Sequence, residues 1–115
     1  GLGSAKSGTH HWWVQKLTSL ALIPLALWFM VSMAMLASAD YGAIIIWVKA
    51  PLVTVFLVLF ITILFYHLKL GVQVVIEDYV YKPVAKALSL FFNAAFAYVF
   101  GLLAIVSILR IALGS

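Results

Sequence analysis

The sequence contains no cysteine and very few acidic residues. Among its 115 residues there are three Asp or Glu and seven Lys or Arg, and only 9% of the chain is charged. Without cysteine, the chain cannot form a disulfide, a thiolate metal site or an iron–sulfur cluster from its own residues. Soluble domains are about one quarter charged. These absences therefore exclude a soluble enzyme and a disordered tail.

Apolar residues are abundant instead. They make up 67% of the chain, and the mean hydropathy is +1.23. Three apolar stretches cover about residues 17–39, 52–76 and 87–113, and each exceeds the ~20 residues that a helix needs to cross a bilayer. The sequence therefore predicts an all-α membrane protein with three transmembrane helices in one membrane domain over residues 1–115. The short connections predict that neighbouring helices are antiparallel and adjacent.

Prolines and small residues refine this prediction. Pro51 and Pro83 stand where the second and third helices should begin, and a missing N–H costs nothing there. Pro24 lies inside the first stretch and should kink that helix. The third stretch carries small residues at helical spacing, which let helices approach closely in lipid: Ala94, Ala97, Gly101 and Ala104. This stripe fits packing within the chain and packing against another subunit equally well.

The basic residues indicate an orientation. The net charge of +4 comes from single lysines near segment ends, which is typical of a membrane protein and not of a nucleic-acid-binding stripe. Four lysines flank the N-terminus and the second connection: Lys6, Lys16, Lys82 and Lys86. Only Lys49 and Arg110 flank the other ends. The positive-inside rule thus predicts that the N-terminus and the second connection are cytoplasmic.

The end of the second apolar stretch carries the clearest candidates for chemistry. His67, Gly71, Val74 and Asp78 are spaced i, i+4, i+7 and i+11, so they share one helix face, with Asp78 about 16 Å from His67 along the axis. An ionisable residue inside a membrane helix is costly and marks a candidate functional site. A histidine above a glycine notch suits an axial haem ligand. The alternative is a histidine that only hydrogen-bonds to a neighbouring helix.

Two further groups of polar residues lie near the same membrane face. The hydroxyl of Tyr79 could hydrogen-bond a carbonyl oxygen, and Asp78 could orient that tyrosine or relay a proton; the alternative is an ordinary helix end. In the N-terminal segment, His10, His11 and Lys16 could meet a haem propionate or a quinone head group. The alternative there is an amphipathic lead-in anchored by two tryptophans, Trp12 and Trp13.

These residues resemble a known family. The second of three helices carries His67 and Gly71 and ends in Asp78-Tyr79-Val80. The N-terminal segment contains Gly8-Thr9-His10 and, further on, Lys16-Leu17-Thr18. Together they resemble the D-type hydrophobic membrane anchor subunits of succinate dehydrogenase (respiratory complex II), and the N-terminal segment is similar to the alphaproteobacterial branch. The first and third helices match only as apolar helices.

The resemblance implies specific roles. His67 would ligate the iron of a haem b whose other axial histidine comes from a companion cytochrome b-type anchor subunit. Tyr79 would hydrogen-bond a ubiquinone carbonyl, with Asp78 beside it. Lys16 (where many relatives have Arg), Lys69 and His10 are candidate contacts for a haem propionate or the quinone. FAD and iron–sulfur clusters would lie in the flavoprotein and iron–sulfur subunits, so this chain has no complete active site. The location would be the bacterial cytoplasmic membrane.

Two other functions remain open from the sequence. One is a haem-free structural anchor of a fumarate reductase-like complex. The other is a small oligomeric transporter, which would need an acidic residue near the centre of a membrane helix. No Asp or Glu lies at such a position here, and this disfavours the transporter.

Overall fold

Four helices make up the structure, which is a computed structural model describing the backbone of residues 2–114 and the side chains of residues 9, 10 and 12–114. They are α1 (Leu2–Leu36), α2 (Tyr41–Lys49), α3 (Pro51–Tyr79) and α4 (Pro83–Leu113). The molecule is elongated, with extents of 54 × 26 × 23 Å. Within the described residues, three helical segments are long and apolar enough to cross a membrane: Trp12–Leu36, Pro51–Tyr79 and Pro83–Leu113. The predicted all-α, three-span architecture is confirmed.

The helix ends differ from the predicted ones. The first helix already begins at Leu2 and ends at Leu36, whereas hydropathy predicts 17–39. An apolar pattern detects the part of a helix that lies in lipid, and it misses turns that continue into polar sequence. Pro51 and Pro83 are the first residues of α3 and α4, as their sequence positions predict, because proline fits the first turn of a helix.

The connection between the first two spans is itself partly helical. Hydropathy treats residues 40–49 as a loop, but the segment Tyr41–Lys49 forms α2. Asp40 caps this helix: its backbone is extended and its carboxylate accepts a hydrogen bond of 2.8 Å from the Ala43 N–H. Such a cap satisfies one of the free N–H groups in the first turn. Lys49 donates from Nζ to the Gly114 carbonyl at 2.9 Å, which joins α2 to the C-terminal end.

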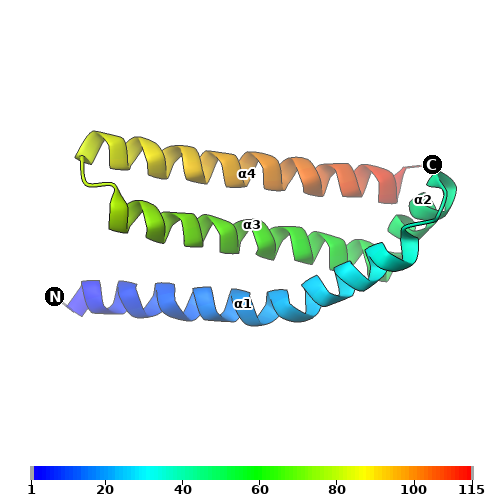
Figure 1. Ribbon diagram of the computed structural model, residues 1–115, viewed down its shortest axis with the longest axis horizontal. Helices are drawn as coiled ribbons and strands as arrows, with labels where there is room; N and C mark the ends of the chain where they lie inside the picture. Colours follow the sequence, from blue (N-terminus) through cyan, green and yellow to red (C-terminus); the bar gives the residue numbers. More distant parts are fainter. Residues whose placement is uncertain (1, 115) are drawn as a thin grey trace.

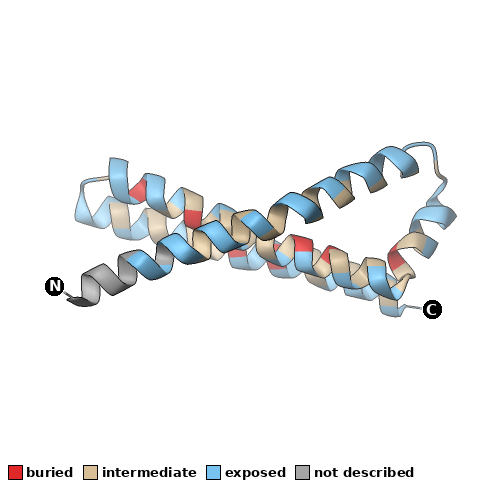
Figure 2. Cartoon of the chain, turned by 90° about the horizontal axis from the view of Figure 1, so that it is seen from below, coloured by how far each residue is buried: buried red, intermediate tan, exposed pale blue. Residues whose placement is uncertain are grey.

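Helix α3 lies between α1 and α4 (Figure 1). The N-terminus and the α3–α4 connection lie at one end of the molecule, and α2 and the C-terminus lie at the other. The lysines of the N-terminal flank therefore share an end with Lys82 and Lys86. Helix α1 bends in its second half and crosses the α3–α4 pair (Figures 1 and 2). Pro24 lies inside α1 and removes one hydrogen bond of the helix, which accounts for the bend.

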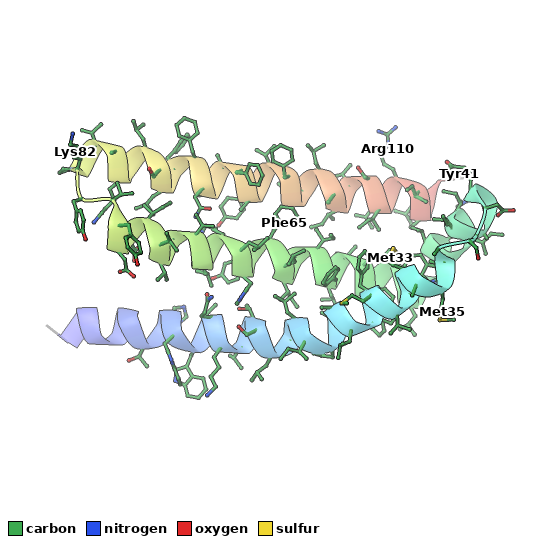
Figure 3. The ribbon with its side chains drawn as sticks, viewed as in Figure 1. Met33, Met35, Tyr41, Phe65, Lys82 and Arg110 are labelled. Carbon is green, nitrogen blue, oxygen red and sulfur yellow. The ribbon has the colours of Figure 1, made fainter. Side chains whose placement is uncertain are left out.

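The contact between α3 and α4 is close. Gly101 is buried, and a Cβ atom added there would lie 3.5 Å from Phe65 of α3. Ala97, one turn away on the same stripe, is 8% exposed. Figure 3 shows Phe65 between the two helices. The small-residue stripe of α4 therefore packs within this chain at Ala97 and Gly101.

Aromatic rings join α1 to its neighbours near the other end. Trp28 stacks on Trp47 of α2 with centroids 5.8 Å apart, and meets Phe56 of α3 edge to face at 5.4 Å. Phe29 stacks on Phe60 of α3 at 4.9 Å. These contacts hold α1 against α3 beyond its bend.

Very little of the apolar surface is buried within the chain. Figure 2 shows how few of the described residues are buried, and the buried hydrophobic side chains among them are Val48, Leu57, Phe60, Leu70, Ile76 and Ala97. Large apolar side chains are exposed on all four helices. In a membrane, such surface faces lipid tails or neighbouring subunits, and neither contact exposes apolar groups to water.

Candidate functional site on helix α3

His67 borders an open groove on the surface of α3. The groove has a volume of about 290 Å³ and is lined by His67, Leu68, Gly71, Val72 and Val75. A Cβ atom added to Gly71 would meet no described atom within 4 Å outside its own helical turn. The notch predicted at Gly71 is therefore open beside the histidine, and its lining is apolar except for the imidazole.

The imidazole of His67 is held from the opposite helix. A hydrogen bond of 3.1 Å joins His67 Nδ1 to Thr18 Oγ1 of α1. Thr18 Oγ1 also donates to the Gln15 carbonyl at 2.9 Å. From its sequence context alone, Thr18 has no predicted role. A lone threonine in an apolar helix is a weak signal, and the sequence does not say which residue of α3 it meets.

The other ring nitrogen of His67, Nε2, has no hydrogen-bond partner in the part of the chain whose side chains are described. The two ring nitrogens of imidazole point in different directions, so Nε2 points away from Thr18. A neutral histidine can ligate a metal through one nitrogen while the other is hydrogen-bonded. The structure therefore contains the hydrogen bond from His67 to a neighbouring helix, and this bond leaves Nε2 unused.

Asp78 and Tyr79 form the last turn of α3. Both are exposed, and Tyr79 has 75% of its surface accessible. Glu77 in the same turn accepts a hydrogen bond of 3.1 Å from Gln73 Nε2. No basic residue occupies this turn, so two carboxylates lie at the negative end of the helix dipole, which is electrostatically unfavourable.

The N-terminal candidates lie along the part of α1 that precedes Thr18. Thr18 lies beside His67, so His10, eight residues earlier, lies about 12 Å nearer the end of the bundle where α1 begins. Asp78 lies toward the same end. The ammonium group of Lys16 lies 4.9 Å from the centroid of the Trp12 ring. Two residues before Thr18, Lys16 is turned about 200° from it around the helix, away from His67. The side chain of His11 lies outside the described residues.

Lys69 is turned toward α4. Its Nζ atom lies 5.8 Å from the Tyr66 ring and 5.4 Å from the Tyr98 ring. Its carbonyl accepts a hydrogen bond of 3.0 Å from Asn93 Nδ2. The side chains of Tyr66, Lys69 and Tyr98 also line a pocket of about 190 Å³ between α3 and α4. The structure thus does not bring Lys69 and His67 together, although they are two residues apart.

No cluster of three or more His, Asp or Glu side chains that could hold a bare metal ion occurs among the described residues. A haem differs from a bare ion because the porphyrin supplies four nitrogen ligands and the protein supplies only axial ones. A single histidine beside an open apolar groove is therefore sufficient as this chain's share of such a site.

Three membrane-length helices define a multi-pass helical membrane protein. Its candidate site is the groove beside His67 on α3. The family model of the succinate dehydrogenase/fumarate reductase transmembrane subunit matches residues 1–108. The chain belongs to that family.

Individual relatives agree with this assignment. A succinate dehydrogenase hydrophobic membrane anchor subunit from Rickettsia bellii is 40% identical over 78 residues, which cover 68% of this chain and 62% of that protein. One from Paracoccus denitrificans is 27% identical over 115 residues, covering 100% of this chain and 88% of that protein. The membrane anchor subunit of Reclinomonas americana is 27% identical over 89 residues, covering 75% and 74%. No solved structure matches the chain. The resemblance to hydrophobic anchor subunits is confirmed.

Proposed function

We propose that this chain is a membrane anchor subunit of a bacterial succinate:ubiquinone oxidoreductase. It would hold a flavoprotein and an iron–sulfur subunit at the cytoplasmic face of the inner membrane, together with a companion anchor subunit. The N-terminus and the α3–α4 connection would face the cytoplasm, because they carry most of the basic residues. Membership of the family supports this role over a transporter.

We further propose that His67 is one axial ligand of a haem b. The observation that carries this proposal is the groove beside His67, where Gly71 leaves the surface open and the lining is apolar. These residues fit a porphyrin, because a flat apolar ring can approach a helix closely only where side chains are short. When bound, haem supplies one-electron redox chemistry. The chain's own share is to ligate through Nε2, to orient the imidazole through Thr18 and to form one apolar wall.

The second axial ligand would come from the companion subunit. This chain's other histidines, His10 and His11, precede Thr18 by seven or eight residues, which is about 10–12 Å along the helix. His67 is therefore the histidine at the depth of the groove. A haem shared between two subunits would also cover part of the apolar surface that this chain leaves open.

The last turn of α3 would contact ubiquinone. Tyr79 is exposed there and can donate its hydroxyl proton to a quinone carbonyl. Asp78 is next to Tyr79, and its carboxylate lies at the negative end of the helix dipole, where a negative charge is unfavourable. Locally unfavourable residues of this kind are expected at functional sites. His10 and Lys16 stay predicted contacts for a haem propionate or the quinone. Lys69 also stays a predicted contact for these groups, although its ammonium group lies near α4.

A visible difference spectrum tests the haem proposal. The complex is purified in detergent through a tag on this chain, and its reduced-minus-oxidised spectrum is recorded with its co-purifying subunits. We expect a low-spin b-type spectrum in the wild type and its loss in His67→Leu. Tyr66→Leu is the matched control, because Tyr66 is adjacent in sequence but lies on the Lys69 side. A six-coordinate spectrum that survives His67→Leu would remove His67 as a ligand, and partners without haem would indicate a haem-free anchor.

Steady-state assays test the quinone contact. In Tyr79→Phe we expect quinone reduction to fall by about 10-fold, the scale of one hydrogen bond of 1.4 kcal/mol. Succinate oxidation with a soluble artificial acceptor should be unchanged, because it bypasses the quinone. Tyr81→Phe is the control, since Tyr81 is similarly exposed at 81%. Equal loss of both activities in Tyr79→Phe would indicate misassembly and not a lost quinone contact.

A further inference from the structure

Thr18 is the polar residue of α1 that meets the proposed haem ligand. Its hydroxyl oxygen lies 3.1 Å from His67 Nδ1, and both residues are half-buried. An imidazole in an apolar environment can rotate about its side-chain bonds unless a hydrogen bond holds it. A residue that fixes the ring plane of a metal-ligating histidine also influences how strongly the histidine binds the metal.

The hydrogen bonds of Thr18 decide which nitrogen carries the proton. A threonine hydroxyl has one proton to donate and two lone pairs that accept. That proton goes to the Gln15 carbonyl at 2.9 Å, a bond that threonine commonly forms within a helix. The oxygen is then left to accept, so the proton between Thr18 and His67 belongs to Nδ1. A neutral imidazole with its proton on Nδ1 has a free lone pair on Nε2.

We propose that Thr18 is a positioning residue, which holds His67 in the Nδ1–H tautomer so that Nε2 can ligate haem iron. This inference rests on the proposed role of His67 as an axial ligand. The reverse arrangement, with Thr18 donating to Nδ1, would place the proton on Nε2 and block ligation. The Thr18–His67 bond also joins α1 to α3, so this contact couples the packing of the two helices to the orientation of the ligand.

The hydrogen bond between Thr18 and His67 should also influence the redox potential of the haem iron. Donation of the Nδ1 proton to an acceptor makes the imidazole a stronger donor to the metal, which favours the oxidised iron. Removal of the Thr18 hydroxyl should therefore raise the midpoint potential of the haem. It should also weaken haem retention, by about 10–100-fold if Thr18 acts like other groups that orient metal ligands.

The experiment compares four forms of the tagged complex: wild type, Thr18→Val, Thr18→Ser and Thr62→Val. Valine keeps the shape of threonine without the hydroxyl, and serine restores the hydroxyl. Thr62 is the matched control, because its hydroxyl donates to the Val58 carbonyl of its own helix at 2.7 Å. The readouts are haem per complex, the midpoint potential from a spectroelectrochemical titration, and the low-spin electron paramagnetic resonance spectrum.

We expect a raised potential and reduced haem retention in Thr18→Val, values near wild type in Thr18→Ser, and no change in Thr62→Val. The same haem content and potential in Thr18→Val as in wild type would overturn the role of Thr18 and leave His67 as ligand. A wild-type complex without haem would overturn the role of both residues. If Thr18→Val does not co-purify with its partners, Thr18→Ala provides the variant without the hydroxyl, and Thr18→Ser must still match wild type.

Discussion

The two sides of α3 differ in how completely this chain covers them. Toward α4, Phe65 fills the space over Gly101, and Asn93 donates a hydrogen bond to the Lys69 carbonyl. Beside His67, no described atom outside the helical turn of Gly71 lies within 4 Å of a Cβ added there, and an apolar groove stays open. One glycine lies at each place. At Gly101 the small residue permits close packing, and at Gly71 it leaves space that this chain does not fill.

This difference separates structural small residues from candidate functional ones. A glycine in a membrane helix by itself permits a close approach and does not say what approaches. The atoms around each glycine show whether the approaching group belongs to the same chain. Gly101 is thereby explained by the fold of this subunit, whereas the described part of this subunit supplies no packing partner for Gly71. We propose haem as that partner.

The largest expected effect is on haem in Gly71→Leu. The leucine side chain would occupy the groove beside His67, so we expect most of the haem to be lost from the purified complex. The chain itself should stay folded, because no described atom outside Gly71's own helical turn lies within 4 Å of the new Cβ. Haem per complex and far-ultraviolet circular dichroism measure the two effects. Wild-type haem content in this variant would show that the groove is not the porphyrin site.

Gly101→Leu should affect stability and leave the groove intact. The new side chain would press on Phe65, whose atoms already lie 3.5 Å from the Cβ position. Overpacking of this kind costs about 1–3 kcal/mol. We expect a lower midpoint of thermal unfolding in detergent for the purified complex. Gly101→Ala is the control and should cause little change, because 3.5 Å is an ordinary contact distance. Equal midpoints for the two variants would contradict the close α3–α4 packing.

The smallest effect is expected in Asn93→Ala. This change removes the hydrogen bond from Asn93 Nδ2 to the Lys69 carbonyl, 3.0 Å long. Hydrogen bonds between membrane helices contribute about 0.6 kcal/mol on average, so the unfolding midpoint should fall slightly and haem content should not change. Ser107→Ala is a useful comparison on the same helix, since the Ser107 hydroxyl donates only within α4. A loss of haem in Asn93→Ala would mean that the two sides of α3 are coupled.

Hydropathy predicted the number of membrane helices correctly and missed their ends. The second and third apolar stretches lie within α3 and α4, and the first overlaps α1 but runs past its end at Leu36, because the length of a lipid-facing helix is set by the bilayer. The start of α1 near Leu2 and the short helix α2 were missed. Helical structure outside the apolar stretches depends on local capping, as at Asp40, and on contacts with the ends of other helices, as between Lys49 and Gly114.

The candidate site was predicted in part. His67 and Gly71 stood out because an ionisable residue and a glycine notch are spaced one turn apart in an apolar helix. Thr18 did not, because its importance comes from a residue 49 positions away in sequence. Lys69 is near His67 in sequence and was predicted to share its site, but a separation of two residues turns it to nearly the opposite side of the helix.

The sequence by itself determined the membrane class, the number of spans and the histidine–glycine pair, because these depend on hydropathy and on spacing along one helix. The family resemblance also rests on residues that are close in sequence. Only the tertiary structure decided which glycine is packed and which is open, and that Thr18 meets His67. Both depend on how separate helices are placed against each other, and many registers of three apolar helices satisfy the same hydropathy pattern.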